Sequence, residues 1–131
     1  MLTVLDSHAL LVYLEREPGF EKVEKLLVQA VSNEQNLLMS SVNFGEVYYI
    51  VHRECGEKEA EKIEKLIDTL PIEIISVDLD LAKEAAIFKS SKKMSYADCF
   101  AAALTKVHKA KLITGDPEFK EVEKVIKIIW L

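Results

Sequence analysis

The 131-residue sequence has few cysteines, glycines and prolines and no long apolar run. Its two cysteines, Cys55 and Cys99, are far apart and form no CxxC pair, so buried apolar roles in a reducing compartment are favoured over catalysis or a disulfide. No apolar segment approaches the roughly 20 residues needed to cross a bilayer. The N-terminal MLTVLD lacks a basic lead-in and a small-residue cleavage site, which argues against a secretory signal. We therefore expect a cytoplasmic protein without a membrane partner.

Several catalytic signatures are also missing. The four glycines are scattered and no GK[ST] follows them, which excludes a P-loop, and no G-x-S-x-G elbow occurs. An excess of positive charge is missing too: the formal net charge is −5 and the sequence pI is about 5.3. This balance argues against holding nucleic acid by bulk electrostatics. It is compatible with an enzyme whose clustered carboxylates meet phosphate through bound cations.

The apolar pattern alternates short runs with longer stretches of helical period. It predicts strands at 2–5, 37–40, 72–77, 111–114 and 126–131, and helices at 7–14, 20–31, 42–53, 57–70, 79–90, 96–108 and 117–124. Near-continuously apolar strands that alternate with helices are typical of a parallel sheet covered on both faces. The expected fold class is α/β: one domain over residues 1–131, in three layers, with a central, mainly parallel sheet of about five strands.

Four carboxylates fall where such a sheet places its ligands, at the carboxyl ends of the strands. Asp6 follows the first strand in TVLD, and Asp116 follows the fourth in LITGD. Glu46 lies one turn into the third helix, on a face shared with apolar residues, and Asp98 is in the first turn of the helix that begins SYADCF. All four are expected to converge at one edge of the sheet.

Each aspartate also has a structural explanation. Asp6 and Asp116 suit helix N-caps, and Ser95 with Asp98 fits a capping box, so capping and a functional site remain equal alternatives for each one alone. Glu46 is harder to explain as structure, because a buried, unpaired charge costs several kcal/mol. Crowded carboxylates repel unless a cation lies between them. Oxygen ligands without a Cys/His set suit Mg²⁺ or Mn²⁺ rather than zinc and predict metal-assisted hydrolysis.

The order TVLDSHALLVYL, SSVNFGEVYYIV, SYADCFAAAL and LITGDPEF resembles PIN domains, particularly the VapC-type toxins of toxin–antitoxin pairs, over essentially the whole chain. The resemblance implies a PIN-like α/β/α fold and a Mg²⁺- or Mn²⁺-dependent endoribonuclease that cuts RNA. It implies Asp6, Glu46, Asp98 and Asp116 as catalytic metal ligands, and Thr114 as a hydroxyl close to the metal. It further implies a homodimer inhibited by a cognate antitoxin. Ser7, next to Asp6, is a second expected neighbour of the site.

Other residues have weaker support. Lys92 and Lys93 precede the Asp98 helix and are candidates to hold RNA phosphates, with a solvated loop as an equal alternative; Arg16 is a similar candidate with less positional support. His8 stands where the family more usually has a small polar residue. As a metal ligand it competes with the commoner role of a helix-surface histidine, which is favoured.

Two rivals remain from other classes. A phosphotransfer fold also places an Asp after its first strand. However, His8 stands where a phosphatase of the haloacid-dehalogenase type needs a second Asp, and no Lys follows the fourth strand as in a receiver domain. The alternative function is a PIN-fold RNA-binding or protein-interaction scaffold with little or no cleavage activity. The complete set of four acids favours the enzyme.

Overall fold

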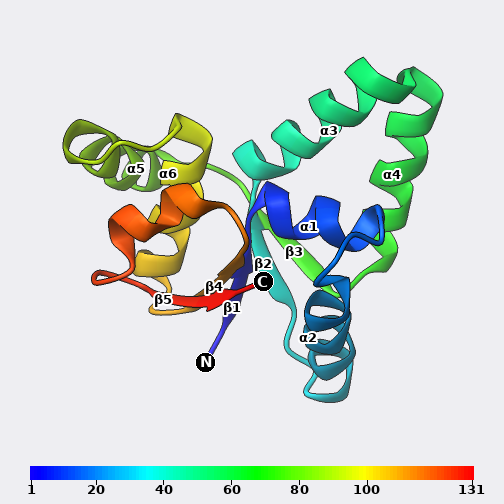
Figure 1. Ribbon diagram of the computed structural model, residues 1–131, viewed down its shortest axis with the longest axis horizontal. Helices are drawn as coiled ribbons and strands as arrows, with labels where there is room; N and C mark the ends of the chain where they lie inside the picture. The colour runs from blue at the N-terminus through cyan, green and yellow to red at the C-terminus, as the bar shows by residue number, and fades with distance from the viewer.

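The computed structural model describes all of residues 1–131, in an order of strands and helices that follows the predicted alternation (Figure 1). The strands are β1 (Thr3–Leu5), β2 (Leu37–Ser40), β3 (Ile72–Ile75), β4 (Lys111–Thr114) and β5 (Lys127–Trp130). The helices are α1 (Ser7–Leu14), α2 (Phe20–Ser32), α3 (Ser41–Cys55), α4 (Glu57–Thr69), α5 (Leu79–Ser91), α6 (Tyr96–Val107) and the 3₁₀ helix η1 (Pro117–Val122). None of these helices has both the length and the apolar character that a bilayer crossing requires.

The five strands form one sheet in the order β3-β2-β1-β4-β5, and every neighbouring pair is parallel. The α/β fold with a parallel sheet is therefore confirmed. In a parallel sheet all strands end at the same edge, and β1 pairs with β4 so that Leu5 lies opposite Ile113. This register brings the two residues that follow, Asp6 and Thr114, next to each other.

Alternate side chains of the strands point into two separate cores, which makes the molecule three layers thick. Val4, Leu38 and Leu112 pack with α5, α6 and η1, whereas Leu5 and Ile113 pack with α1 to α4. Figure 1 shows these two groups of helices on opposite sides of the sheet. Because both faces are covered, only the sheet edges and the strand ends are free to form a site.

Three strands are shorter than the sequence predicted: β1 begins at Thr3 instead of residue 2, and β3 and β5 are shortened as well. The expected strand 72–77 ends at Ile75, because the Val77 N–H donates to Ser41 Oγ (3.2 Å) and Asp78 caps α5 by accepting from the Leu81 N–H (2.8 Å). The strand expected from residue 126 begins at Lys127, since the Ile126 N–H donates back to the carbonyl of Val122. Apolar character alone did not reveal these hydrogen bonds.

Candidate active site

Asp6 is both a helix cap and the centre of an acidic site. Its side chain is fully buried at the end of β1, where Oδ1 accepts from the Ala9 N–H (2.8 Å) and Oδ2 accepts from the Thr114 hydroxyl. Burial raises the pKa of Asp6 from 3.8 to about 7; the two hydrogen bonds lower it, and the charges of Asp116 and Glu46 raise it further. Capping and site membership, which the sequence left as alternatives, coexist in this residue.

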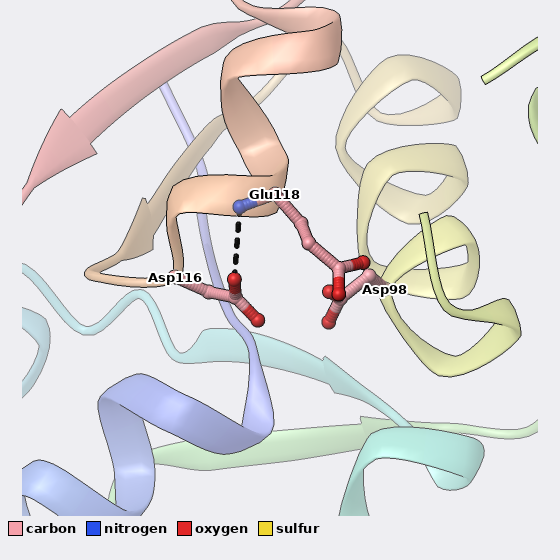
Figure 2. A group of neighbouring side chains, drawn as sticks. All are labelled: Asp98, Asp116 and Glu118. Carbon is pink, nitrogen blue, oxygen red and sulfur yellow. Dashed lines mark hydrogen bonds between the residues drawn. The ribbon is translucent and has the colours of Figure 1, made fainter. Parts of the chain in front are cut away.

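Thr114 joins Asp6 to Asp116. Its buried hydroxyl donates to Asp6 and accepts from the backbone N–H of Asp116 (3.0 Å). Asp116 in turn caps η1, since its Oδ1 accepts from the Glu118 N–H (2.9 Å) and Pro117 occupies the first position of that helix (Figure 2). One hydroxyl thus fixes two acids that are 110 residues apart in the sequence.

Asp98 faces these acids from α6. Ser95 caps this helix by accepting from the Asp98 N–H (3.2 Å), and the Asp98 side chain is buried. Burial, together with the charges of Asp116, Asp6 and Glu118, raises the pKa of Asp98 well above its usual range. One carboxylate oxygen from each of Asp98, Asp116 and Glu118 lies within 4.8 Å of the others (Figure 2).

Glu46 lies across the same open groove, outside this tight group. Its half-buried carboxylate accepts a short hydrogen bond from the Ser7 hydroxyl, and it lines the groove together with Asp98 and Asp116. Its charge is close enough to raise the pKa of Asp6. The partner that an acid on an apolar helix face requires is therefore the neutral hydroxyl of Ser7, whose position beside the site was expected.

Asn43 ties the helix of Glu46 to the helix of Asp98. The buried Asn43 side chain donates from Nδ2 to the carbonyl of Ala97 (3.0 Å) and accepts at Oδ1 from the Ser40 hydroxyl (2.6 Å). Ala97 immediately precedes Asp98. The amide thus fixes the first turn of α6 against the start of α3.

The donor set fits a hard divalent cation. The clustered acids supply only oxygen ligands, as Mg²⁺ and Mn²⁺ prefer. None of the four ion pairs in the protein includes Asp6, Glu46, Asp98, Asp116 or Glu118. Burial is the largest cause of the raised pKa values of Asp6 and Asp98, and repulsion by the neighbouring carboxylates raises both pKa values further. A cation that binds several of their oxygens would relieve this repulsion.

Comparison with protein families identifies the chain. A model of the PIN domain matches residues 3–125. The chain belongs to the PIN domain family. Comparison of the sequence with curated proteins gives no significant match.

Solved structures share the fold of this PIN domain at low sequence identity. VapBC2 from Rickettsia felis, bound to promoter DNA, matches with a TM-score of 0.75 and 15% identity over 100% of this chain and 99% of that chain. A toxin–antitoxin complex from Klebsiella pneumoniae matches with a TM-score of 0.69 and 16% identity over 97% of this chain and 95% of that chain. VapC20 from Mycobacterium tuberculosis is a toxin that cleaves the sarcin–ricin loop. It matches with a TM-score of 0.67 and 14% identity over 90% of this chain and 92% of that chain. At these identities the likeness is one of fold.

Glu118 is a fifth acid of the PIN-domain site that the sequence analysis did not nominate. Its Oε1 accepts from the Ser95 N–H (2.7 Å), so it joins the acidic group and also holds the loop that enters α6. The neighbouring Glu121 accepts from the Lys93 N–H (3.1 Å) in the same way. The available signal was the second acid two residues after Asp116 in LITGDPEF, which the tight 3₁₀ turn brings back to the groove.

The three basic candidates for RNA binding are not placed equally. Lys92 and Lys93 lie in the loop before α6 that Glu118 and Glu121 anchor, beside the acidic site. Arg16 follows the opposite end of α1 from Asp6, where it pairs with Glu24 (3.2 Å) and stacks over Tyr13 and Phe20. The structure does not bring Arg16 to the groove, because the eight residues of α1 separate the two ends by roughly 12 Å.

Proposed function

We propose that this PIN domain is a metal-dependent endoribonuclease that hydrolyses RNA phosphodiester bonds, with Mg²⁺ or Mn²⁺ as its cofactor. The observation that carries the proposal is that Glu46, Asp98 and Asp116, which are distant in sequence, line one groove. Asp6 lies buried beside them, close enough for the charges of Asp116 and Glu46 to add to the rise in its pKa that burial causes. Asp98, Asp116 and Glu118 would hold the metal, since their oxygens are already grouped. Asp6 and Glu46 would add negative charge close to the bound metal.

The residues around the acids have distinct tasks in this proposal. A divalent cation held by Asp98, Asp116 and Glu118 would supply Lewis-acid chemistry for hydrolysis of a phosphodiester by water. Thr114 orients the Asp6 carboxylate by donating to it and holds the backbone of Asp116 by accepting from its N–H, and Ser7 holds Glu46 in the groove. Neither a catalytic serine nor a catalytic histidine is required, because the attacking nucleophile is water.

We also propose that the enzyme is the VapC-type toxin of a toxin–antitoxin pair, a homodimer in the cytoplasm that a cognate antitoxin inhibits. Support comes from the likeness of the whole chain to VapBC2 and to the Klebsiella pneumoniae complex. VapC20 is a toxin that cleaves the sarcin–ricin loop, and its likeness to this chain supports RNA as the substrate class.

The test is RNA cleavage by the purified protein with Mg²⁺ or Mn²⁺, with and without a chelator. We expect cleavage that EDTA abolishes and that Asp98→Asn or Asp6→Asn removes without lowering the thermal melting temperature. Asp78→Asn is the matched control: Asp78 also caps a helix but does not line the groove, and asparagine caps as well as aspartate. A folded wild type that binds RNA without cutting it would favour the scaffold alternative. Unchanged cleavage by Asp98→Asn would point to a contaminating nuclease.

A further inference from the structure

His8 lies in the acidic groove, and one edge of its imidazole ring packs against Gly115. It is the second residue of α1, its side chain is exposed, and it lines the groove with Glu46, Asp98, Asp116 and Glu118. It is the only residue lining this groove with a side-chain nitrogen. His8 does not belong to the group of carboxylates whose oxygens lie within 4.8 Å of one another.

The backbone of Gly115 determines how the imidazole is oriented. The Gly115 N–H donates to His8 Nδ1 (3.3 Å), so Nδ1 acts as the acceptor and the ring proton resides on Nε2. The ring packs directly on the glycine: a Cβ at position 115 would lie 2.7 Å from His8 Cε1 and 3.2 Å from Nδ1. Position 115 therefore accommodates the ring only because it lacks a side chain.

Nε2 then carries a proton that no group of the protein accepts. The Nδ1–Cε1 edge faces Gly115, and the only hydrogen bond of the His8 side chain is the one at Nδ1. Of the two hydroxyls that line the groove, that of Ser7 donates to Glu46, whereas that of Ser95 accepts from the Asp98 N–H and keeps its own proton free. A substrate phosphate that enters among the four carboxylates of the groove needs hydrogen-bond donors, and His8 Nε2 is the free nitrogen donor there.

We propose that His8 binds a non-bridging phosphate oxygen of the RNA through Nε2–H, and that the contact of its ring with Gly115 sets its position. This inference rests on the proposed function, because it takes RNA as the ligand. His8 is thus a substrate-binding residue and not a ligand of the metal. Hydrogen bonds to charged groups are among the stronger ones in proteins, so loss of this contact should weaken RNA binding about tenfold or more.

The test measures the affinity for a fluorescein-labelled single-stranded RNA by fluorescence anisotropy, in an Asp98→Asn background that prevents cleavage. His8→Ala should raise the Kd about tenfold. His8→Asn retains an acceptor for the Gly115 N–H but loses the donor at the Nε2 position, so it should bind as weakly as His8→Ala. His8→Gln carries an amide N–H close to the Nε2 position and should recover part of the affinity.

Gly115→Ala provides an independent arm, because it displaces the ring without removing it. The nearest atoms to the added methyl group belong to the His8 side chain, which can move, so the melting temperature should hardly change while the Kd rises. In the His8→Ala background the same substitution should have no further effect on the Kd. If the effects of the two substitutions on the Kd were fully additive, the proposed positioning of the His8 ring by Gly115 would be overturned.

Two results separate this inference from the proposed function. If the wild type cleaves no RNA but the His8 series changes the Kd as described, the nuclease proposal fails and the His8 contact stands. An unchanged Kd in His8→Ala, or absence of RNA binding, overturns the His8 contact. Mn²⁺ affinity of His8→Ala, measured by calorimetry in the otherwise wild-type protein, should equal that of the wild type; its loss would make His8 a metal ligand and would contradict the proposal.

Discussion

Asp6 shows how the site is assembled at the scale of single residues. A buried carboxylate is ordinarily unfavourable, yet this one lies among other acids and accepts two hydrogen bonds, one from Ala9 and one from Thr114. Strong perturbation of pKa by burial and like charges is characteristic of functional positions. Burial of the Asp6 carboxylate destabilises the metal-free protein, and binding of a cation would offset this loss of stability.

The raised pKa of Asp6 predicts the pH dependence of the metal-free protein. Its pKa rises from 3.8 to about 7, so the folded state binds the proton more tightly than the unfolded state. The resulting stabilisation is complete below about pH 4 and is lost as the pH rises through 7. In EDTA the melting temperature should therefore fall between pH 5.5 and 8.5, and saturating Mg²⁺ should reduce the fall.

Asp6→Asn is the control for this pH effect, because asparagine cannot ionise and can still cap α1. Its melting temperature should depend less on pH over the same interval, and should exceed that of the wild type at pH 8.5 in EDTA. Asp98, whose pKa is also raised, contributes in the same direction, so part of the slope should remain. If the melting temperature fell with pH equally steeply in the wild type and in Asp6→Asn, burial of Asp6 would not be the cause of the pH dependence.

Glu118 and Glu121 form a matched pair for the contribution of the fifth acid. Each accepts a hydrogen bond from a backbone N–H of the loop before α6, but only Glu118 belongs to the acidic group. Glutamine retains an acceptor oxygen and removes the charge. Glu118→Gln should weaken Mn²⁺ binding about tenfold by calorimetry, and Glu121→Gln should leave it unchanged. Equal effects of the two substitutions would make Glu118 only a loop anchor.

At the scale of elements, the site depends on how α3 and α6 are held together. Asn43 makes this link by donating to the carbonyl of Ala97, one residue before Asp98. Asn43→Ala removes the hydrogen bonds that the side chain makes with that carbonyl and with the proton of the Ser40 hydroxyl. We expect a loss of about 1–3 kcal/mol in the free energy of unfolding by urea titration, together with slower RNA cleavage because Asp98 is less well positioned.

Gly45→Ala is the matched control on the same helix. Gly45 is exposed in α3, and a Cβ there would meet nothing within 4 Å. Alanine should therefore raise the free energy of unfolding by up to about 1 kcal/mol, the difference in helix propensity. An unchanged stability in Asn43→Ala, with the expected gain in Gly45→Ala, would show that the α3–α6 link is weaker than its geometry indicates.

The helices and strands were largely predictable, because each has a local signal. Asp6, Ser40, Asp78 and Ser95 cap the helices that they precede, and apolar runs mark the strands. The ends of β3 and β5 were not predicted, since they depend on individual hydrogen bonds, one to another segment (Val77 to Ser41) and one within a turn (Ile126 to Val122). Similarly, Glu118 was not predicted, because the tight 3₁₀ turn of η1 brings its side chain to the groove, and apolar periodicity does not reveal such a turn.

At the scale of the whole molecule, strand order makes the site. The sequence predicted that Asp6 and Asp116 lie at the same edge of the sheet, but not that β1 and β4 are neighbours. That pairing brings Asp6 and Thr114 together, and it results from long-range packing on both faces of the sheet. The link from α3 to α6 through Asn43, which no local pattern indicates, then sets Glu46 and Asp98 around the same groove.

The acidic net charge also belongs to the whole molecule. The chain has 22 acidic residues and 17 Lys and Arg residues, and its formal charge is −5. Five acids, Asp6, Glu46, Asp98, Asp116 and Glu118, line or adjoin the groove. The remaining acids equal the basic residues in number, so the low pI reflects the site and does not argue against an RNA substrate.

The central claim is that acids from distant parts of the chain share a divalent cation. Titration of Mn²⁺ into the metal-free protein, followed by calorimetry, tests it most directly. We predict saturable binding in the wild type and in Asp78→Asn, and loss of binding in Asp98→Asn and Asp116→Asn with the fold intact by circular dichroism. Absence of Mn²⁺ binding in the wild type, or wild-type affinity in both Asp98→Asn and Asp116→Asn, would contradict the account.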